Sequence, residues 1–200
     1  MPRLNRFLAA GAVLAYPLLC HAAVAFDDAR WAALGIALLG WAMLRLRSPA
    51  AGALAAVGLF AAGIVLASVM PAVIVYAPPI VLNVALCALF ASTLRAGSEP
   101  LITRFARAER GDMPADLERY TRTLTWIWVA FFALMAAISL SLAVLASPGA
   151  WSLFTNVVNY LLVLLMFVLE YGYRRLRYRH HRHPGPAEFL RRLHTYRVFR

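Results

Sequence analysis

The chain has 200 residues, of which 62% are hydrophobic, and its mean hydropathy is +0.69. A soluble domain of this size does not need so many apolar residues for its core, so the composition indicates an integral membrane protein. A net charge of +11 suggests nucleic-acid binding in a soluble protein, but here the arginines flank long apolar stretches, where membrane insertion accounts for them. We therefore expect no nucleic-acid partner.

Long apolar segments recur along the chain. A hydrocarbon core about 30 Å thick needs roughly 20 apolar residues per helix. Six stretches suit this length, so the sequence predicts an all-α fold, a polytopic membrane helical bundle with six transmembrane helices. We expect a transmembrane domain over residues 1–173 and a basic tail over residues 174–200. The six segments lie at residues 7–26, 31–46, 51–70, 73–94, 124–146 and 151–173.

The first segment imitates a secretory signal, because Arg3 and Arg6 precede its apolar run and Ala23-Val24-Ala25 follows it. The run exceeds the roughly 7–15 apolar residues of a signal peptide, which favours a retained helix over a cleaved one. Cleavage stays an alternative and leaves the orientation of the other segments unchanged.

The third and fourth segments form a predicted helical hairpin, since residues 48–94 contain no charged residue. Prolines at its tip, over residues 70–79, predict irregular backbone there. A plain turn at the membrane interface is a simpler reading than a re-entrant loop.

Arginine is distributed unequally between the two sides. All 20 basic residues are Arg, which together with abundant Ala indicates a GC-rich bacterial genome. If the segments alternate across a membrane, two Arg precede the first, two accompany the end of the second, six lie between the fourth and fifth, and nine follow the sixth. Only Arg30 lies on the opposite side. Because cytoplasmic loops carry the basic excess, we expect a multi-pass protein of the bacterial inner membrane with both termini and residues 95–123 in the cytoplasm.

The tryptophans favour the same orientation, because indole rings prefer the headgroup level. Trp31 and Trp151 lie at the start of segments that begin on the predicted outer side. Trp41, Trp126 and Trp128 lie near predicted inner ends.

The connection over residues 95–123 carries six Arg against five acidic residues. Ser98 as a cap, with Pro100 early and Gly111 as a stop, predicts a short helix. Its apolar positions share one face and Arg104, Arg107 and Arg110 another, so we expect an amphipathic cytoplasmic helix at the interface. A second helix start at Asp112 and Pro114 leads into the fifth segment.

Four arginines of this connection form a candidate anion- or headgroup-binding site: Arg104, Arg107, Arg119 and Arg122. Guanidinium groups bind phosphate in a bidentate manner. A solvated loop that only anchors the chain to lipid is the simpler account of the same residues.

The same region carries a resemblance to a known family, through Glu99-Pro100-Leu101-Ile102-Thr103-Arg104-Phe105-Ala106-Arg107, Arg119-Tyr120-Thr121-Arg122 and Trp126-Ile127-Trp128. The chain resembles an uncharacterised family of small bacterial inner-membrane proteins, often encoded with genes for aryl-polyene (xanthomonadin-like) pigments. The resemblance implies a pathway with acyltransferases and acyl carrier proteins. It supplies no catalytic residue.

Motifs for chemistry are weak in this sequence. Asp27-Asp28-Ala29-Arg30 lacks the further aspartates of a phosphatidyltransferase site, and no Gly-x-Ser-x-Gly elbow or phosphate-binding glycine loop occurs. His180, His181 and His183 stand between arginines and are most simply part of a charged tail. We therefore predict no catalytic residue, no metal and no cofactor.

Polar residues inside predicted spans are the other candidates, because burying them in lipid is costly. Asn156, Asn159 and Tyr160 cluster on the sixth segment, with Asn83 on the fourth as a predicted partner. Hydrogen bonds between helices are the leading account. Glu170 is predicted to pair with Arg174 or Arg175, one turn further on.

The tail carries nine Arg against Glu188. Beyond Pro184-Gly185-Pro186, a short amphipathic helix is predicted for a membrane surface or a partner, from the spacing of Phe189, Leu190, Leu193 and Tyr196.

Three functions follow from these patterns. The favoured one is an accessory protein that binds or positions a lipid-like or acyl-carrier-bound intermediate at the cytoplasmic face. Its predicted partners are membrane lipids and acyl carrier protein or peripheral biosynthetic enzymes, and a homo-oligomer is compatible with the sequence. The alternative is a small transporter or flippase for an amphipathic molecule, with a cavity lined by Asn83, Asn156 and Asn159. A membrane transferase is third, because the sequence does not support enzymatic activity.

Overall fold

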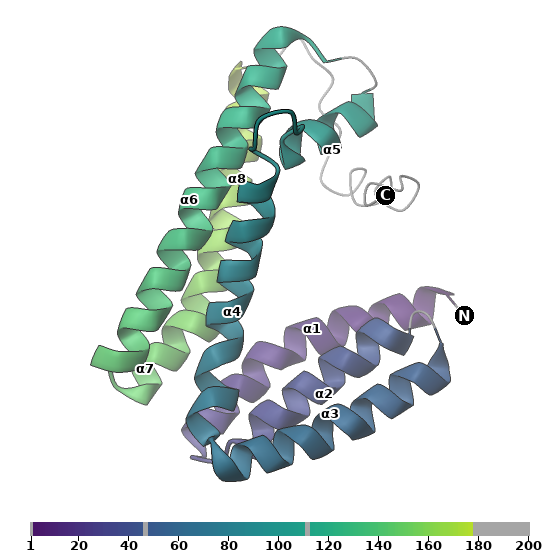
Figure 1. The fold of residues 1–200 in the computed structure, drawn as a ribbon, viewed down its shortest axis with the longest axis vertical. Coiled ribbons are helices and arrows are strands. Elements are labelled where there is room, and N and C mark those ends of the chain that lie inside the picture. Colours follow the sequence, from purple (N-terminus) through teal and green to yellow (C-terminus); the bar gives the residue numbers. More distant parts are fainter. Residues whose placement is uncertain (1, 46–47, 111–112, 178–200) are drawn as a thin grey trace. The chain divides into compact units, whose positions relative to one another are not determined.

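The computed structural model describes residues 2–45, 48–110 and 113–177, and the regular structure in these residues is entirely helical (Figure 1). The predicted all-α class is therefore confirmed. The predicted tail helix lies outside the described residues, as do His180, His181 and His183. The helices are α1 (Pro2–Ala25), α2 (Arg30–Arg45), α3 (Pro49–Val69), α4 (Pro71–Ser92), α5 (Leu101–Arg110), α6 (Ala115–Leu145), α7 (Pro148–Leu153), the π-helical turn η1 (Phe154–Val158) and α8 (Asn159–Arg177).

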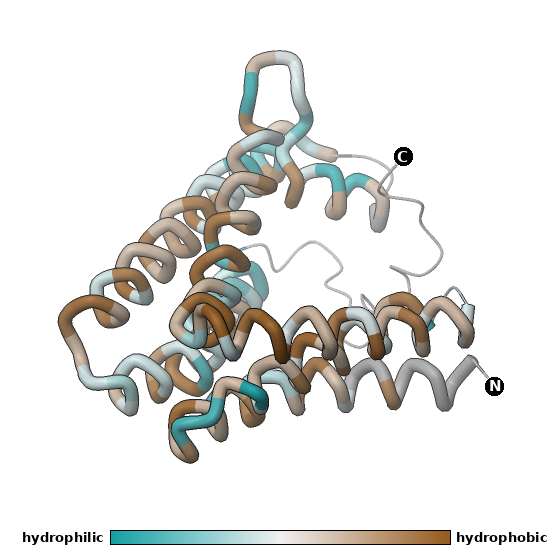
Figure 2. Tube along the Cα trace, turned by 60° about the horizontal axis from the view of Figure 1, so that its bottom comes forward, coloured by the Kyte–Doolittle hydropathy of each residue, from teal (hydrophilic) through white to brown (hydrophobic). Residues whose placement is uncertain are grey.

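Within the described residues, four helices are long and apolar enough to cross a membrane: Ala50–Val69, Pro71–Ser92, Ala115–Leu145 and the continuous run Pro148–Arg177. Apolar residues dominate these helices, whereas hydrophilic residues gather on α5 and the connection before it (Figure 2). The apolar part of α1 is shorter, and α2 has 16 residues, which is about 24 Å at 1.5 Å per residue. The described chain is thus all-helical with four helices of membrane-spanning length and composition, and the count of six spans stays a prediction.

The described chain forms two compact units. The first contains Met1–Val81 and Ile138–Leu162, and the second contains Leu82–Ala137 and Val163–Arg200. Helices α4, α6 and α8 each contribute to both.

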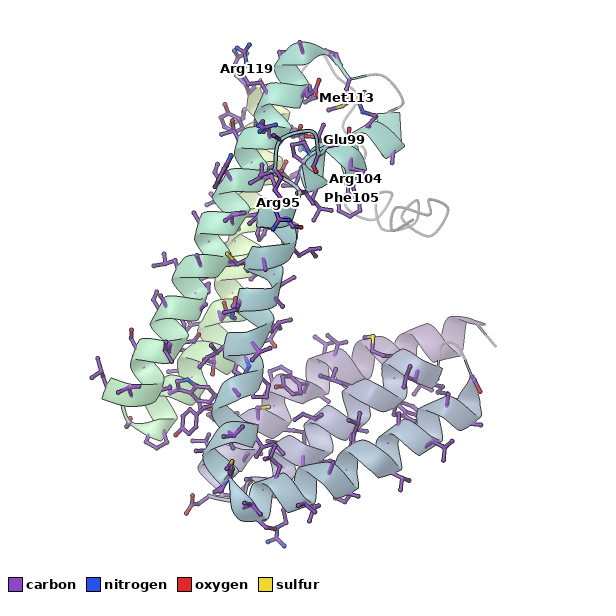
Figure 3. The ribbon with its side chains drawn as sticks, viewed as in Figure 1. Arg95, Glu99, Arg104, Phe105, Met113 and Arg119 are labelled. Atoms are coloured by element: carbon purple, nitrogen blue, oxygen red, sulfur yellow. The ribbon has the colours of Figure 1, made fainter. Side chains whose placement is uncertain are left out.

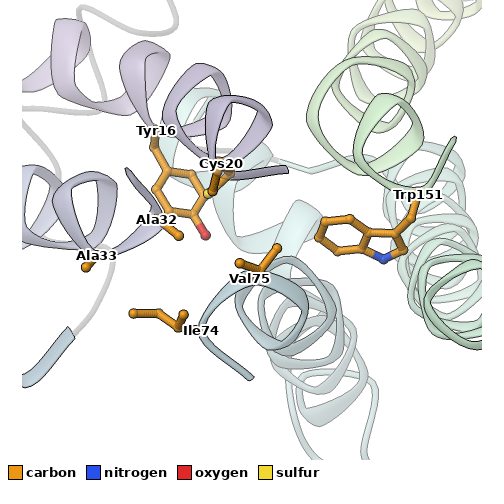
Figure 4. Close-up of a cluster of buried hydrophobic side chains, with 8 residues drawn as sticks. Tyr16, Cys20, Ala32, Ala33, Ile74, Val75 and Trp151 are labelled. Atoms are coloured by element: carbon orange, nitrogen blue, oxygen red, sulfur yellow. The ribbon is translucent and has the colours of Figure 1, made fainter. Parts of the chain in front are cut away.

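In the first unit, α1, α2 and α3 lie side by side (Figure 1). Small residues permit their close approach, since a Cβ added at Gly63 would lie 2.7 Å from the Cβ of Ala33. The core beside them combines Tyr16 and Cys20 from α1 with Ile74 from α4 and Trp151 from α7 (Figure 4). Tight contact between small residues is a common way for membrane helices to associate.

The predicted irregular backbone over residues 70–79 is wrong. Met70 alone separates α3 from α4, which begins at Pro71 and continues through Pro78 and Pro79. Proline suits the first position of a helix, where no N–H donor is needed. The two inner prolines remove helical hydrogen bonds, which membrane helices tolerate when neighbouring elements pack around them.

The second unit has an aromatic core on α6, where Trp128 and Phe132 lie against Phe90 of α4 and Phe167 of α8. The prediction that indole rings face the headgroups is therefore wrong for Trp128, and equally for Trp151, whose Nε1 donates to the Ser139 carbonyl at 3.1 Å. Both are buried in protein. Trp126 is 56% exposed, as a headgroup-facing ring would be.

Candidate functional site

The N-terminus of α5 is fixed to the rest of the second unit. The backbone N–H of Leu101 donates to Thr93 Oγ1 at 3.0 Å, and the buried hydroxyls of Thr103 and Thr121 lie 2.8 Å apart. The short helix predicted in this connection is confirmed. The prediction of Ser98 as its cap is wrong. The side chain that caps Leu101 is that of Thr93, which directly follows α4.

Three of the four predicted anion-binding arginines converge on the connection between α4 and α5. Arg104 Nη2 lies 3.5 Å from the Glu99 carbonyl oxygen, and Arg107 Nε donates to Glu99 Oε1 at 2.7 Å. Arg122 Nη2 reaches the Leu94 carbonyl from α6 at 3.4 Å. We call Arg104, Arg107 and Arg122 the arginine junction.

Arg119, the fourth predicted member, does not join the arginine junction. Figure 3 places its side chain on the side of α6 that faces away from α5. The predicted set is therefore divided by the structure into three residues around one connection and one residue apart from them.

The three guanidinium groups of the arginine junction have different partners. Arg107 is paired with two carboxylates, because its Nη2 also lies 3.7 Å from Glu118 Oε1. Arg104 and Arg122 hydrogen-bond to neutral backbone carbonyls, and neither is paired with a carboxylate in the described part of the chain. A phosphate would form stronger, charge-assisted hydrogen bonds than these carbonyls do.

A second polar cluster lies in the first unit. Ser152 is fully buried, and its Oγ lies 2.9 Å from His21 Nδ1 on α1 and accepts a hydrogen bond from Asn156 Nδ2 at 3.1 Å. Asn156, predicted to lie within a span, thus forms a hydrogen bond through its side chain. The predicted pairing of Asn156 with Asn83 stays a prediction.

The other predicted members of this cluster differ in environment. Asn159 is buried and its Oδ1 has no hydrogen-bond partner among the described residues, whereas Tyr160 is 40% exposed. His21 and Ser152 were not predicted as members of this cluster. A histidine beside a cysteine in an apolar segment was the available signal, but the sequence does not show that Ser152 lies opposite it.

The His21 and Ser152 pair is a packing contact and not an activated nucleophile. A catalytic serine needs an exposed Oγ and an imidazole oriented by a third group. Ser152 is fully buried, and within the described residues the His21 ring has no carboxylate partner. The chemistry of this pair is therefore that of a hydrogen bond between helices.

Glu170 on α8 forms the predicted ion pair, since Arg174 Nε lies 3.3 Å from its Oε1. Tyr120 of α6 donates to the same oxygen at 3.3 Å, and its ring stacks on Tyr173. This contact joins α6 to α8 in the second unit.

A metal centre has no support in residues 2–45, 48–110 and 113–177, which contain no cluster of three or more His, Cys, Asp or Glu side chains with suitable placement. Comparison of the chain with family models, curated proteins and solved structures finds no match. The family resemblance seen in the sequence stays a prediction.

Proposed function

We propose that the chain is an accessory protein of the bacterial inner membrane that holds an anionic intermediate, either lipid-like or bound to an acyl carrier, at the arginine junction. Aryl-polyene or lipid biosynthesis is the proposed setting, on the strength of the sequence resemblance. The protein positions this intermediate for peripheral enzymes and performs no chemistry of its own.

The observation that carries this proposal is the convergence of Arg104, Arg107 and Arg122 on one short connection. Among the described residues, two of these side chains hydrogen-bond to neutral acceptors alone, which a phosphate or carboxylate can displace. The fixed N-terminus of α5 holds Arg104 and Arg107 in place before a ligand arrives, which lowers the entropy cost of binding.

The proposal includes the six-span arrangement, with both termini and the arginine junction on the cytoplasmic side. The excess of arginine in those segments supports it. In this orientation the arginine junction is accessible to a soluble carrier protein and to lipid headgroups of the inner leaflet.

The transporter alternative receives less support. It requires Asn156 to line a path for a substrate, whereas the Asn156 side chain donates to buried Ser152. Hydrogen bonds of this kind serve the association of helices.

The test is mass spectrometry of the protein purified in mild detergent. Wild-type protein should retain an anionic amphiphile or an acyl carrier protein. The double variant Arg104→Gln/Arg122→Gln should lose most of it at unchanged membrane abundance, because each charge-assisted contact contributes about 1.5–3 kcal/mol.

Arg30→Gln is the control for the loss of an arginine outside the junction, because it removes one positive charge from an arginine of the first unit that is paired with Asp28 at 2.8 Å. It should retain the ligand. Equal retention by the double variant and the control would refute the proposed function.

A further inference from the structure

Arg119 and Trp126 share the outward face of α6. They are seven residues apart, which is about two helical turns, and both side chains are exposed. The buried side chains of this stretch, Leu117, Leu124 and Trp128, occupy other positions around the helix. Arg119 and Trp126 therefore point away from the protein core of the second unit.

The charge of Arg119 is not compensated within the described residues. Arg107 has Glu99 and Glu118 as partners, whereas Arg119 forms no ion pair with any described side chain. An exposed arginine near the end of an apolar helix attracts anions at the membrane surface.

The exposure of Trp126 suits a surface that meets lipid. An indole ring prefers the level of the headgroups, with its apolar body toward the acyl chains and its N–H toward water. Arg119 lies about 10 Å further along the helix, toward its polar end, and a long arginine side chain can bend back toward the phosphates. Beyond Trp126, the same face presents the small exposed residues Ala130 and Ala133, which leave room for an acyl chain.

We propose that Arg119 and Trp126 form a binding site for one anionic phospholipid. Arg119 binds the phosphate, the Trp126 ring lies against the glycerol region, and an acyl chain follows α6 past Ala130. The occupant is a lipid of the surrounding bilayer. It is separate from the intermediate that the arginine junction holds, so this inference does not rest on the proposed function.

The experiment is native mass spectrometry of the full chain in detergent, titrated with phosphatidylglycerol or with phosphatidylcholine. Wild-type protein should bind the first phosphatidylglycerol more tightly than phosphatidylcholine. Arg119→Gln and Trp126→Leu should each weaken the first binding step about tenfold, because each removes one of the two contacts.

Arg175→Gln is the control, because Arg175 is also an exposed arginine, in the last turn of α8. It should leave the first binding step unchanged. An equal loss of affinity in the control, or no loss of affinity in Arg119→Gln, would overturn the proposed lipid-binding site. A dimer that Trp126→Leu dissociates would assign this face to a second copy of the chain and would also overturn it.

The two proposals fail separately. Arg104→Gln/Arg122→Gln should still bind phosphatidylglycerol at Arg119 and Trp126, and Arg119→Gln should retain the copurified intermediate.

Discussion

The hydroxyl of Ser152 connects two helical elements through one oxygen. It lies between His21 of α1 and Asn156 of η1, in a fully buried position. Removing it would leave His21 and Asn156 without this partner, and Asn156 is buried.

We predict that Ser152→Ala destabilises the protein by about 1 kcal/mol, the size typical of hydrogen bonds between membrane helices. The measurement is the midpoint of thermal unfolding in detergent, which should fall.

Ser68→Ala is the control, because the Ser68 hydroxyl is exposed and donates only to the Ile64 carbonyl of its own helix. It should leave the midpoint nearly unchanged. Equal midpoints for both variants would show that the Ser152 contacts do not stabilise the first unit.

At the scale of the element, α5 depends on contacts made before and after it in the chain. Thr93 caps its first N–H, and the Thr103 hydroxyl meets that of Thr121. A ten-residue helix is marginal in water by itself, so these contacts hold it in place.

We predict that Thr93→Val speeds amide hydrogen exchange at Leu101 and the residues that follow, because a lost helix cap costs about 1 kcal/mol. Thr123→Val is the control, since the Thr123 hydroxyl is exposed and donates only to the Arg119 carbonyl. If exchange in α5 is the same in both variants, Thr93 does not hold the helix.

Local sequence features were sufficient to predict that α5 exists and that Glu170 pairs with Arg174, because helix periodicity and i,i+4 spacing are short-range properties. They could not identify Thr93 as the cap, since a chain turn brings it to Leu101. They also grouped Arg119 with the arginine junction, although its direction around α6 separates it. Which of Trp126 and Trp128 is buried depends on the aromatic side chains of α4 and α8, which no local pattern in α6 reveals.

At the scale of the whole molecule, the proposed topology can be measured directly. In a background without Cys20 and Cys87, single cysteines at the exposed positions Phe26 and Gly149 should react with an impermeant maleimide in intact spheroplasts. A cysteine at exposed Ser98 should react only after the membrane is opened.

The reverse pattern would invert the orientation. Protection of Phe26→Cys alone would show that α1 and α2 do not both cross the membrane. The distinction matters because α1 and α2 are the helices whose apolar lengths fall short of a full span.

The π-helical turn η1 has a consequence for the history of the chain. A π turn contains one residue more than an α turn, and each residue of an α-helix advances it by about 100°. Loss of one residue within Phe154–Val158 would restore regular α-helical winding, and the helix beyond it would keep facing as it does now, because the π turn absorbs the extra residue locally. A one-residue gap in this segment of a related sequence should therefore coincide with an unchanged set of inward-facing residues on the helix beyond it.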